Sequence, residues 1–287
     1  MANRLTTAVA SADETYGAEG PRVLAVTNQK GGVGKTTTAI NLGTALAAVG
    51  ERVMIIDIDS QGNASTGLGI APEERDKTIY DVLADGYSLL DAAIETDVPD
   101  LFVVSANADL VGFEPKALKE SDRAFRLRNA IAELRADQAG EPADDRISYI
   151  LIDCPPSLNL LTLNSLVASN AVLVPVQSEF FALEGIAQLH QTIQGVKAEL
   201  NPGLEIQGIV LTMHEATTRL SSEVEAEVRK VFGATVYTTV IPRNVKVAEA
   251  PSHGKPILLY DYECKGSQAY VQLATELITR ERQVRAA

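Results

Sequence analysis

A short turn rich in glycine and lysine most constrains what this chain can fold into. It reads Lys-Gly-Gly-Val-Gly-Lys-Thr-Thr-Thr over residues 30–38, between the apolar run 23–26 and the helix-forming stretch 39–49. A strand that leads through such a turn into a helix forms a phosphate cradle, because glycines let successive backbone N–H groups point at bound oxygens. We therefore predict a phosphate-binding loop in which Lys35 supplies a point charge and the Thr36 hydroxyl ligates Mg²⁺.

The loop departs from the usual pattern G-x-x-x-x-G-K-[ST] at its first position. Gln29 stands where the pattern has glycine, and a second lysine, Lys30, follows it five residues before Lys35. A lysine in a solvated loop would be unremarkable, but the surrounding positions also fit a nucleotide loop. We therefore predict that two lysines bracket one phosphate site.

Length and composition agree with a globular α/β protein. The chain has 287 residues, of which 46% are hydrophobic and 22% charged, and no apolar run approaches the roughly 18 residues that span a bilayer. Residues 1–20 are polar and small, without the apolar core of a secretory signal, so we expect a disordered tail followed by a single domain over residues 21–287. The two cysteines, Cys154 and Cys264, provide neither a disulfide framework nor a zinc pair, which favours the reducing cytoplasm.

Continuously apolar segments rich in valine and isoleucine alternate with amphipathic ones. Such segments are typical of strands that are covered on both faces, and they predict strands at 22–27, 52–57, 101–105, 148–153, 171–176, 206–212 and 235–240. Between them we expect helices, including one with an apolar stripe over 186–200 and one that begins with a capping box of Ser222 and Glu225; the polar stretch 136–146 reads as a surface loop. The pattern predicts an α/β fold with a mainly parallel twisted sheet and helices on both faces.

Three aspartates follow predicted strands near the phosphate loop. Asp57 and Asp59 lie just past the carboxyl end of the second strand, and alternation along an extended segment turns both to the same side. One can then hold a Mg²⁺-bound water while the other positions an attacking water. Asp153 ends another apolar run, which is the usual second Mg²⁺ element of phosphate-loop NTPases. We read Cys154, its neighbour, as a small buried side chain.

Taken in order, the motifs closely resemble those of the ParA/Soj-type chromosome-partitioning ATPases of the MinD/ParA superfamily. The matching segments are 30–36, 57–69, 153–156, 174–179, 182–185, 241–245 and 249–256, within a resemblance that covers about residues 21–281. The resemblance implies a deviant Walker A fold that binds ATP and Mg²⁺ and dimerises as an ATP sandwich. It further implies nonspecific binding of double-stranded DNA by the dimer, and slow hydrolysis that a ParB-type centromere-binding partner stimulates. The location implied is the cytoplasm, on the nucleoid.

The resemblance also assigns roles by position. Lys35 would hold the β- and γ-phosphates, Lys30 would reach the partner subunit's phosphates, and Asp59 would orient the attacking water. Thr36 would ligate Mg²⁺ directly, with Asp57 and Asp153 acting through its waters. The nucleotide site would comprise Lys30, Gly31, Gly32, Val33, Gly34, Lys35, Thr36 and Thr37, with Met213, Pro242 and Asn244 around the adenine.

DNA contacts are expected from four cations, Arg229, Lys230, Arg243 and Lys246. On composition alone they would be ordinary solvated surface charges, and the formal charge of −13 means that any DNA site is a local patch within an acidic field. Family resemblance favours the DNA-binding interpretation.

Two positions depart from the family pattern. Ser60 stands where the family usually has proline after the second aspartate, so the backbone there is expected to be looser and hydrolysis to differ in rate. Thr217 stands where the family tends to have arginine, with Arg219 displaced by two residues.

Other functions compete with that of a DNA-segregation ATPase. A membrane-cycling relative similar to MinD would need a carboxyl-terminal amphipathic anchor. An apolar stripe is present, formed by Tyr270, Leu273, Ala274, Leu277 and Ile278, but the opposite face of the helix carries Gln, Thr and Glu rather than lysine. We therefore expect this stripe to pack on the sheet and do not expect the protein to bind membranes. An electron carrier like the nitrogenase iron protein would need two well-placed cysteines, which Cys154 and Cys264 do not provide. An ATPase that positions another cargo stays open. We expect His190, His214 and His253 to be structural or surface residues.

Overall fold

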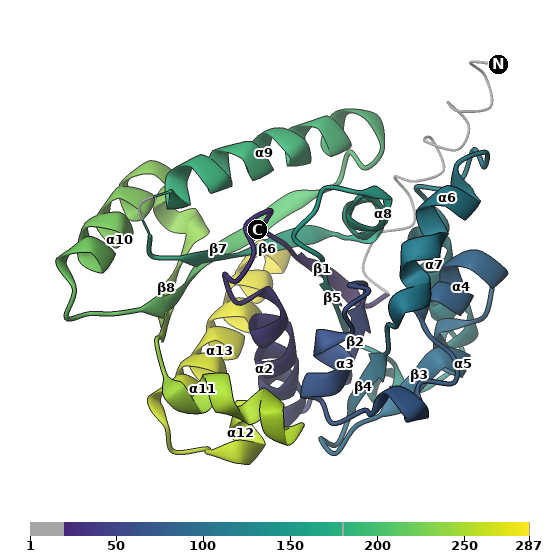
Figure 1. Ribbon diagram of the computed structural model, residues 1–287, viewed down its shortest axis with the longest axis horizontal. Helices are drawn as coiled ribbons and strands as arrows, with labels where there is room; N and C mark the ends of the chain where they lie inside the picture. Colours follow the sequence, from purple (N-terminus) through teal and green to yellow (C-terminus); the bar gives the residue numbers. More distant parts are fainter. Residues whose placement is uncertain (1–19, 180, 287) are drawn as a thin grey trace.

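A single eight-stranded sheet forms the centre of the molecule (Figure 1). The computed structural model describes residues 20–179 and 181–286, the last three of these by their backbone alone; the predicted tail lies outside the described residues except for Gly20. The strand order is β3-β4-β2-β5-β1-β6-β7-β8, and every neighbouring pair is parallel except β3 with β4. The strands are β1 Arg22–Val26, β2 Val53–Asp57, β3 Ala93–Glu95, β4 Leu101–Val104, β5 Tyr149–Asp153, β6 Ala171–Gln177, β7 Glu205–His214 and β8 Val236–Pro242.

Helices follow most of the strands, as right-handed crossovers between parallel strands require. The α-helices are α2 Lys35–Ala48, α3 Asn63–Gly67, α4 Ile79–Asp85, α5 Leu89–Ala92, α6 Phe113–Ala117, α7 Arg126–Asp137, α8 Leu160–Ala168, α9 Ala182–Glu199, α10 Arg219–Phe232, α11 Val245–Glu249, α12 Ile257–Tyr260 and α13 Lys265–Ala286. Short 3₁₀ turns occur at Pro72–Glu74, Ala108–Gly112, Ala143–Asp145, Gly233–Thr235 and Ala250–His253. No helix in the described part of the chain is both long and apolar enough to cross a membrane.

The core consists of two apolar layers, one on each face of the sheet. Successive residues of β1 alternate between them: Val23 and Ala25 belong to the layer under α7, α8 and α9, whereas Leu24 and Val26 belong to the layer under α2 and α13. Figure 1 shows α8, α9 and α10 on one side of the sheet and α2 with α13 on the other. This double coverage explains why the strands read as unbroken apolar runs.

The predicted fold class is confirmed, with all seven predicted strands present to within two residues at either end. The short antiparallel strand β3 was not predicted. The loop expected over 136–146 begins later, because α7 continues to Asp137.

The predicted capping box at Ser222 is wrong, since α10 begins at Arg219. The Thr218 hydroxyl and backbone N–H both donate to the carbonyl of Glu215, at 3.0 and 2.9 Å, and this turn starts the helix nearly one turn earlier than predicted. Glu225 instead accepts a hydrogen bond from Arg229.

Candidate nucleotide-binding site

The predicted phosphate loop joins β1 to α2 at the carboxyl edge of the sheet, where ligand sites of open α/β sheets lie. Gly34 forms the N-cap of α2 with φ of 86°, a left-handed conformation that glycine adopts without strain. Gly32 is also left-handed, and a Cβ atom built on it would meet no atom within 4 Å. The loop therefore borders open space at the positive end of a 14-residue helix, which suits an anion.

Two side chains hold this loop, one that follows β1 within the same loop and one on β7. The Asn28 amide donates to the carbonyl of Pro175 on β6 at 2.8 Å and accepts from the Lys30 N–H at 3.0 Å. On the other side, the Thr212 hydroxyl of β7 donates to the carbonyl of Val33 at 2.8 Å. Both side chains are buried, so the loop is fixed before any ligand binds.

The two lysines occupy different positions. Lys35 is buried, and its ammonium donates to the carbonyl of Lys30 at 3.1 Å, within the loop itself. Burial lowers the pKa of Lys35, and the carboxylate of Asp153 opposes that shift. Lys30 lies at the rim, with 39% of its side chain exposed, and forms an ion pair with Glu179 after β6. One cation therefore belongs to the interior of the site and the other is accessible from outside.

Asp153 is a buried acid whose oxygens have no close hydrogen-bond partner among the described residues. It lies at the end of β5, fully buried, and neither carboxylate oxygen accepts a hydrogen bond from the described residues. Burial, and then the charge of Asp57, raise the pKa of Asp153 well above its usual value; Thr36 and Lys35 oppose the shift only in part. A buried acid with unused oxygens next to a threonine hydroxyl suits a hydrated divalent cation, which would supply the missing partners.

Asp57 and Asp59 have different surroundings, although Asp57 ends β2 and Asp59 lies only two residues later. Asp57 pairs with Asp153 in the sheet register and is fully buried, and burial raises its pKa to about 6. Its carboxylate accepts hydrogen bonds from the N–H and hydroxyl of Ser65, at 2.9 and 2.8 Å. Asp59 is partly exposed, and its carboxylate accepts only the nearby Gln61 N–H, at 3.1 Å, among the described contacts. Of the two, Asp59 is the one that a water molecule can reach.

The residues expected around an adenine lie at the ends of β7 and β8. Met213 has φ of 49°, which is unusual for a residue other than glycine, and a Cβ atom on Gly34 would lie 3.7 Å from the Met213 methyl group. Pro242 pairs with His214 across the two strands. Asn244 caps α11, because its side-chain oxygen accepts from the Lys246 N–H at 2.8 Å. Met213 therefore lies beside the loop, while the side chain of Asn244 is engaged in local structure.

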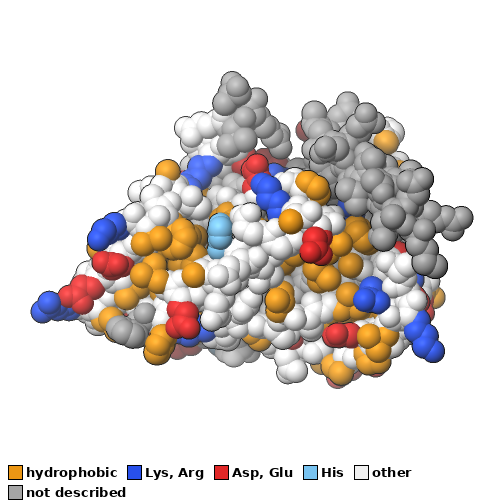
Figure 2. Space-filling view, turned by 90° about the horizontal axis from the view of Figure 1, so that it is seen from above, with side chains coloured by type: hydrophobic (Ala, Val, Ile, Leu, Met, Phe, Trp, Pro, Cys, Tyr) orange, Lys and Arg blue, Asp and Glu red, His pale blue; other side chains and the backbone are white. Residues whose placement is uncertain are grey.

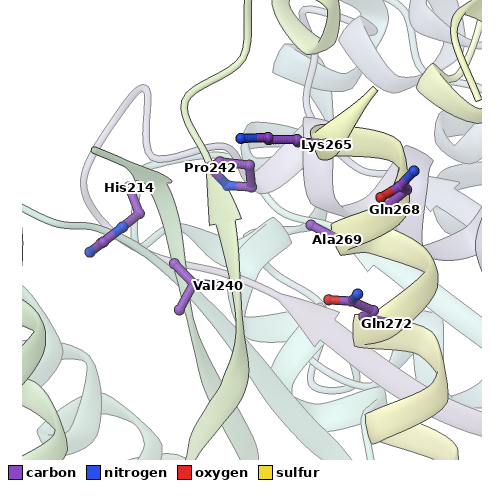
Figure 3. A pocket seen from close by; sticks show the side chains of 7 residues that line it. All are labelled: His214, Val240, Pro242, Lys265, Gln268, Ala269 and Gln272. Carbon is purple, nitrogen blue, oxygen red and sulfur yellow. The ribbon is translucent and has the colours of Figure 1, made fainter. Parts of the chain in front are cut away.

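An open pocket of about 270 Å³ lies next to this region, between the end of β8 and the start of α13 (Figure 3). Pro242 lines it, but Met213 and the phosphate loop do not. In Figure 3 the His214 side chain turns away from α13, whereas Lys265 extends toward Pro242. The lining residues are His214, Val240, Pro242, Lys265, Gln268, Ala269 and Gln272.

The four predicted DNA-binding cations lie in two segments, the end of α10 and the residues after β8. The Arg229 guanidinium donates to the carbonyls of Tyr237 and Thr238 near the start of β8, whereas Arg243 and Lys246 follow its end. Glu225, the carboxylate partner of Arg229, also lies 2.9 Å from the His214 ring, and the carbonyl of His214 accepts the Arg243 N–H at 3.0 Å. Lys230 is exposed at the end of α10.

Three of these four cations have carboxylate partners within the chain. Arg229 pairs with Glu225, Arg243 with Glu215 at 2.5 Å, and Lys246 with Glu249 at 3.5 Å. On the face over α9, Figure 2 shows acidic and basic side chains interspersed, without a broad area of either sign. Any DNA contact by these residues would compete with their own carboxylates.

Sequence reasoning missed the side chains that hold the site from behind. Asn28 and Thr212 fix the loop, and Ser65 binds Asp57, yet none was predicted to have a role. Asn28 and Thr212 have only position as a sequence signal, since each lies near the carboxyl end of a predicted strand, and Ser65 has no such signal.

Fold and site define a class of protein. The sheet is mainly parallel, and its first strand leads through a glycine loop with two lysines into a helix. Aspartates end the strands β2 and β5. This combination is typical of a phosphate-loop nucleotide-binding protein of the deviant Walker A type. The family profile described as an AAA domain matches residues 21–206.

Known relatives refine this class. The chain is 58% identical to the chromosome partitioning protein ParA of Caulobacter vibrioides (strain NA1000 / CB15N), covering 91% of this chain and 95% of that protein. It is 46% identical to the chromosome-partitioning ATPase Soj of Treponema pallidum (strain Nichols), covering 91% and 99%. The chain therefore belongs to the ParA/Soj family of chromosome-partitioning proteins.

A solved structure supports the fold. Cobyrinic acid a,c-diamide synthase from Mycobacterium smegmatis, with bound ADP and magnesium, superposes with a TM-score of 0.77 at 34% identity. The match covers 91% of this chain and 96% of that one.

Proposed function

We propose that residues 21–287 form a single ATPase domain that segregates DNA, and that ATP and Mg²⁺ bind at the loop of residues 30–37. The observation that carries this proposal is the pair of lysines on one phosphate loop, with Lys35 buried inside and Lys30 exposed at the rim. The names of the relatives support the same activity, since one is called a chromosome-partitioning ATPase.

The residues present fit Mg²⁺ together with a nucleotide. Among the described residues, no group of three or more His, Cys, Asp and Glu side chains could hold a metal alone, which agrees with an ion that also uses phosphate oxygens. Thr36 would ligate it directly, and Asp153 would hold its waters with Asp57 behind. When bound, the ion would neutralise charge that develops on the phosphates.

The chain's own residues would supply the rest of the hydrolytic site. Lys35, already buried beside the loop, would hold the β- and γ-phosphates, and the backbone of residues 31–34 would receive phosphate oxygens. Asp59, partly exposed at the start of its turn, would orient the attacking water. Phosphoryl transfer depends mainly on such positioning and charge neutralisation.

A second copy of the chain would complete the site. Lys30 would leave Glu179 and reach the phosphates bound by the partner, so that only the assembled dimer hydrolyses ATP. The ATP dimer would bind double-stranded DNA nonspecifically on the nucleoid in the cytoplasm, using Arg243, Lys246, Arg229 and Lys230. A ParB-type partner would stimulate the slow hydrolysis and release the dimer.

A membrane-cycling role has less support. Tyr270, Leu273, Ala274 and Leu277 are buried in the layer between the sheet and α2, so this stripe of α13 is not available to a bilayer. A role in positioning some other cargo would use the same ATPase cycle and differ only in the partner.

Size analysis with ATP and with ADP, with and without nonspecific duplex DNA, tests the proposal. We expect a dimer with ATP and Mg²⁺, a monomer with ADP, and a DNA complex only in the ATP state. Repeating the measurement with Asp59→Ala prevents turnover during the run. A single subunit in ATP and Mg²⁺, even with that variant, would overturn the proposal.

A further inference from the structure

Ser65, a buried serine in the short helix α3, connects three segments at the edge of the site. Its N–H and hydroxyl both donate to the same oxygen of Asp57 on β2, at 2.9 and 2.8 Å. The hydroxyl also accepts from the N–H of Ala106, after β4, at 3.2 Å. Ser65 is fully buried, so no water replaces these bonds. Its hydroxyl therefore fastens α3 to two neighbouring strands.

Asp57 extends this connection to the proposed hydrolytic residue. Its other carboxylate oxygen accepts the N–H of Asp59, at 3.3 Å. One buried carboxylate therefore holds both ends of the loop from Asp59 to Ser65. The Asp59 side chain itself has no strong contact of this kind, so its position depends on the backbone beneath it.

A second set of contacts fixes the same loop from outside. The Arg75 guanidinium donates to the carbonyls of Ala106 and Ile70 and to the Thr66 hydroxyl, at 2.8 to 2.9 Å. A Cβ atom on Gly62 would lie 2.3 Å from Arg75 and 2.8 Å from the Ala106 carbonyl, so the loop packs closely here. These contacts restrict the loop at Gly62 and Thr66.

We infer that Ser65 is a positioning residue for ATP hydrolysis, which acts through Asp57 to fix the loop that carries Asp59. The inference rests on the proposed role of Asp59 in orienting water. The residue at position 60 makes such a restraint useful. A proline there would restrict the backbone of the loop through its ring, but this chain has Ser60 instead. The hydrogen bonds of Ser65 restrict the same loop by other means.

The expected signature is a loss of rate without a loss of binding. A displacement of about 1 Å in a residue that orients a reactant can cost about 10²-fold in rate. Phosphate affinity depends on the loop of residues 30–37, whereas the side chain of Ser65 forms its hydrogen bonds with Asp57 and Ala106. Ser65→Ala should therefore slow hydrolysis of bound ATP by about tenfold or more and leave ATP affinity within about twofold.

Single-turnover hydrolysis and ATP affinity, measured on the full chain, test this inference. Ser105→Ala is the matched control, because Ser105 is also buried nearby but its hydroxyl has no hydrogen-bond partner among the described residues; it should match the wild type. Ser65→Cys, with a side chain of similar shape and a weaker donor, provides a second variant if Ser65→Ala does not fold; it should show the same split.

A double variant separates positioning from general loosening of the structure. If Ser65 acts through Asp59, then adding Ser65→Ala to Asp59→Ala should change the residual rate less than about twofold. An equal further loss in that background would overturn the inference, as would a wild-type rate in Ser65→Ala. Failure of the wild type itself to hydrolyse ATP would overturn the proposed function as well.

Discussion

At the scale of single residues, the site gathers acidic groups where burial is least favourable for them. Asp57 and Asp153 lie opposite each other at adjacent strand ends, both fully buried, with Lys35 as the buried cation beside them. Burying charged groups without partners costs stability. Bound ATP and Mg²⁺ would provide partners for these groups, since the phosphates are anionic and the metal ion is a divalent cation.

Asp59 is the residue at which we expect the clearest effect on chemistry. Asp59→Ala should bind ATP and DNA with little change but lower the hydrolysis rate by about 10²-fold or more, because a positioned carboxylate contributes at least that much to activating water. The variant should therefore accumulate as a dimer in ATP, as size analysis and phosphate release would show. Asp91→Ala, which removes an exposed carboxylate on α5, is the control, and normal turnover of Asp59→Ala would rule out the role.

Sequence motifs point to candidate site residues on the phosphate loop and at strand ends, but not to the side chains that support them. Lys30, Lys35 and Asp59 follow from spacing within motifs, because a turn or strand end fixes where they point. Ser65 and Thr212 act through tertiary hydrogen bonds to Asp57 and Val33, and no local pattern encodes which distant atoms will meet. Prediction of the DNA contacts meets the same obstacle, since sequence does not show that Arg243 pairs with Glu215.

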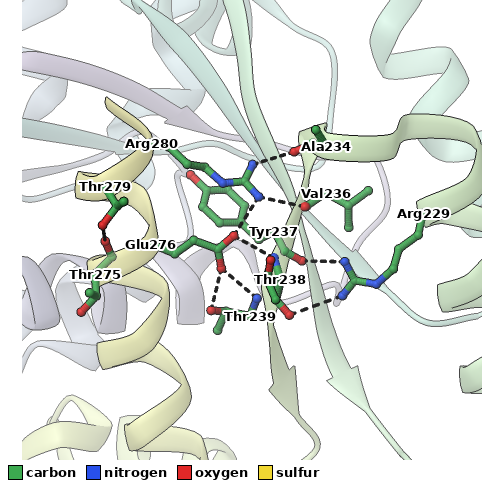
Figure 4. A network of polar contacts seen from close by, with 10 residues as sticks. All are labelled: Arg229, Ala234, Val236, Tyr237, Thr238, Thr239, Thr275, Glu276, Thr279 and Arg280. Atoms are coloured by element: carbon green, nitrogen blue, oxygen red, sulfur yellow. Dashed lines mark hydrogen bonds and ion pairs between the residues drawn. The ribbon is translucent and has the colours of Figure 1, made fainter. Parts of the chain in front are cut away.

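At the scale of elements, the sheet ends at β8, whose outer edge is closed by side chains rather than by another strand (Figure 4). Glu276 of α13 accepts the N–H groups of Thr238 and Thr239, each at 2.8 Å. Arg280, one helical turn later, donates to the carbonyls of Ala234 and Val236, at 3.0 and 2.9 Å. Open strand edges invite pairing with other chains, so these contacts protect the edge as well as anchor α13.

We expect Glu276 to stabilise the fold in a pH-dependent way. Burial alone would raise the pKa of Glu276, but hydrogen bonds from Thr238 and Thr239 outweigh it and hold the pKa below 4.5. The folded state therefore holds fewer protons than the unfolded state, so the stabilisation is complete above about pH 4.5 and disappears as pH falls through the lower folded value.

Thermal melting of Glu276→Gln measures this contribution. At pH 7 the variant should lose about 1–2 kcal/mol, since a charge-assisted pair of hydrogen bonds becomes a neutral one, which corresponds to a fall of about 2–6 °C in Tm. The difference from the wild type should shrink below pH 4.5. Glu199→Gln, at the exposed end of α9, should melt like the wild type, and a difference that grew in acid would contradict the assignment.

Helices and strands with a strong apolar pattern were predicted from the sequence. Those whose presence or boundaries depend on tertiary contacts were missed or misplaced. The parallel strands follow from runs such as 149–153, which are apolar on both faces. The three-residue β3 exists only through its pairing with β4, and α10 begins at Arg219 because of a hydroxyl contact to Glu215. The apolar stripe of α13 was predicted, but not its polar contacts with β8.

At the scale of the whole molecule, the formal charge of −13 means that the proposed DNA binding would need a local basic patch. Arg243 already forms an ion pair with Glu215, so in the proposed complex DNA phosphates would have to displace that carboxylate. A site of this kind should bind usefully only at modest ionic strength.

Paired variants test this competition in the ATP state. Arg243→Ala should lose DNA affinity and lower the slope of log affinity against log salt by about 0.9 for each DNA phosphate that the arginine had neutralised, with ATP-dependent dimerisation unchanged. Glu215→Gln should raise DNA affinity by about threefold to tenfold, because it frees the same cation. Arg128→Ala, on α7, controls for net charge, and unchanged DNA affinity in Arg243→Ala would move the binding site elsewhere.

Lys30 concerns the molecule as one half of an assembly. In the single chain its ammonium forms an ion pair with Glu179, and both side chains are about 40% exposed, so a purely internal role and a role in a second copy are both physically reasonable. An exposed pair of this kind contributes little to stability, about 0–1 kcal/mol. Replacing Lys30 should therefore have little effect on the stability of the single chain, and any large effect on activity should appear only when two copies share nucleotide.

Two variants of the same ion pair distinguish these roles. Lys30→Ala should abolish the ATP-dependent dimer or its hydrolysis, because the cation that would reach the second phosphate site is gone. Glu179→Gln breaks the identical pair but keeps the cation, so it should still dimerise and turn over. Size analysis and phosphate release on both variants decide the matter: if the two behave alike, Lys30 acts only within its own loop, and the shared-site mechanism is wrong.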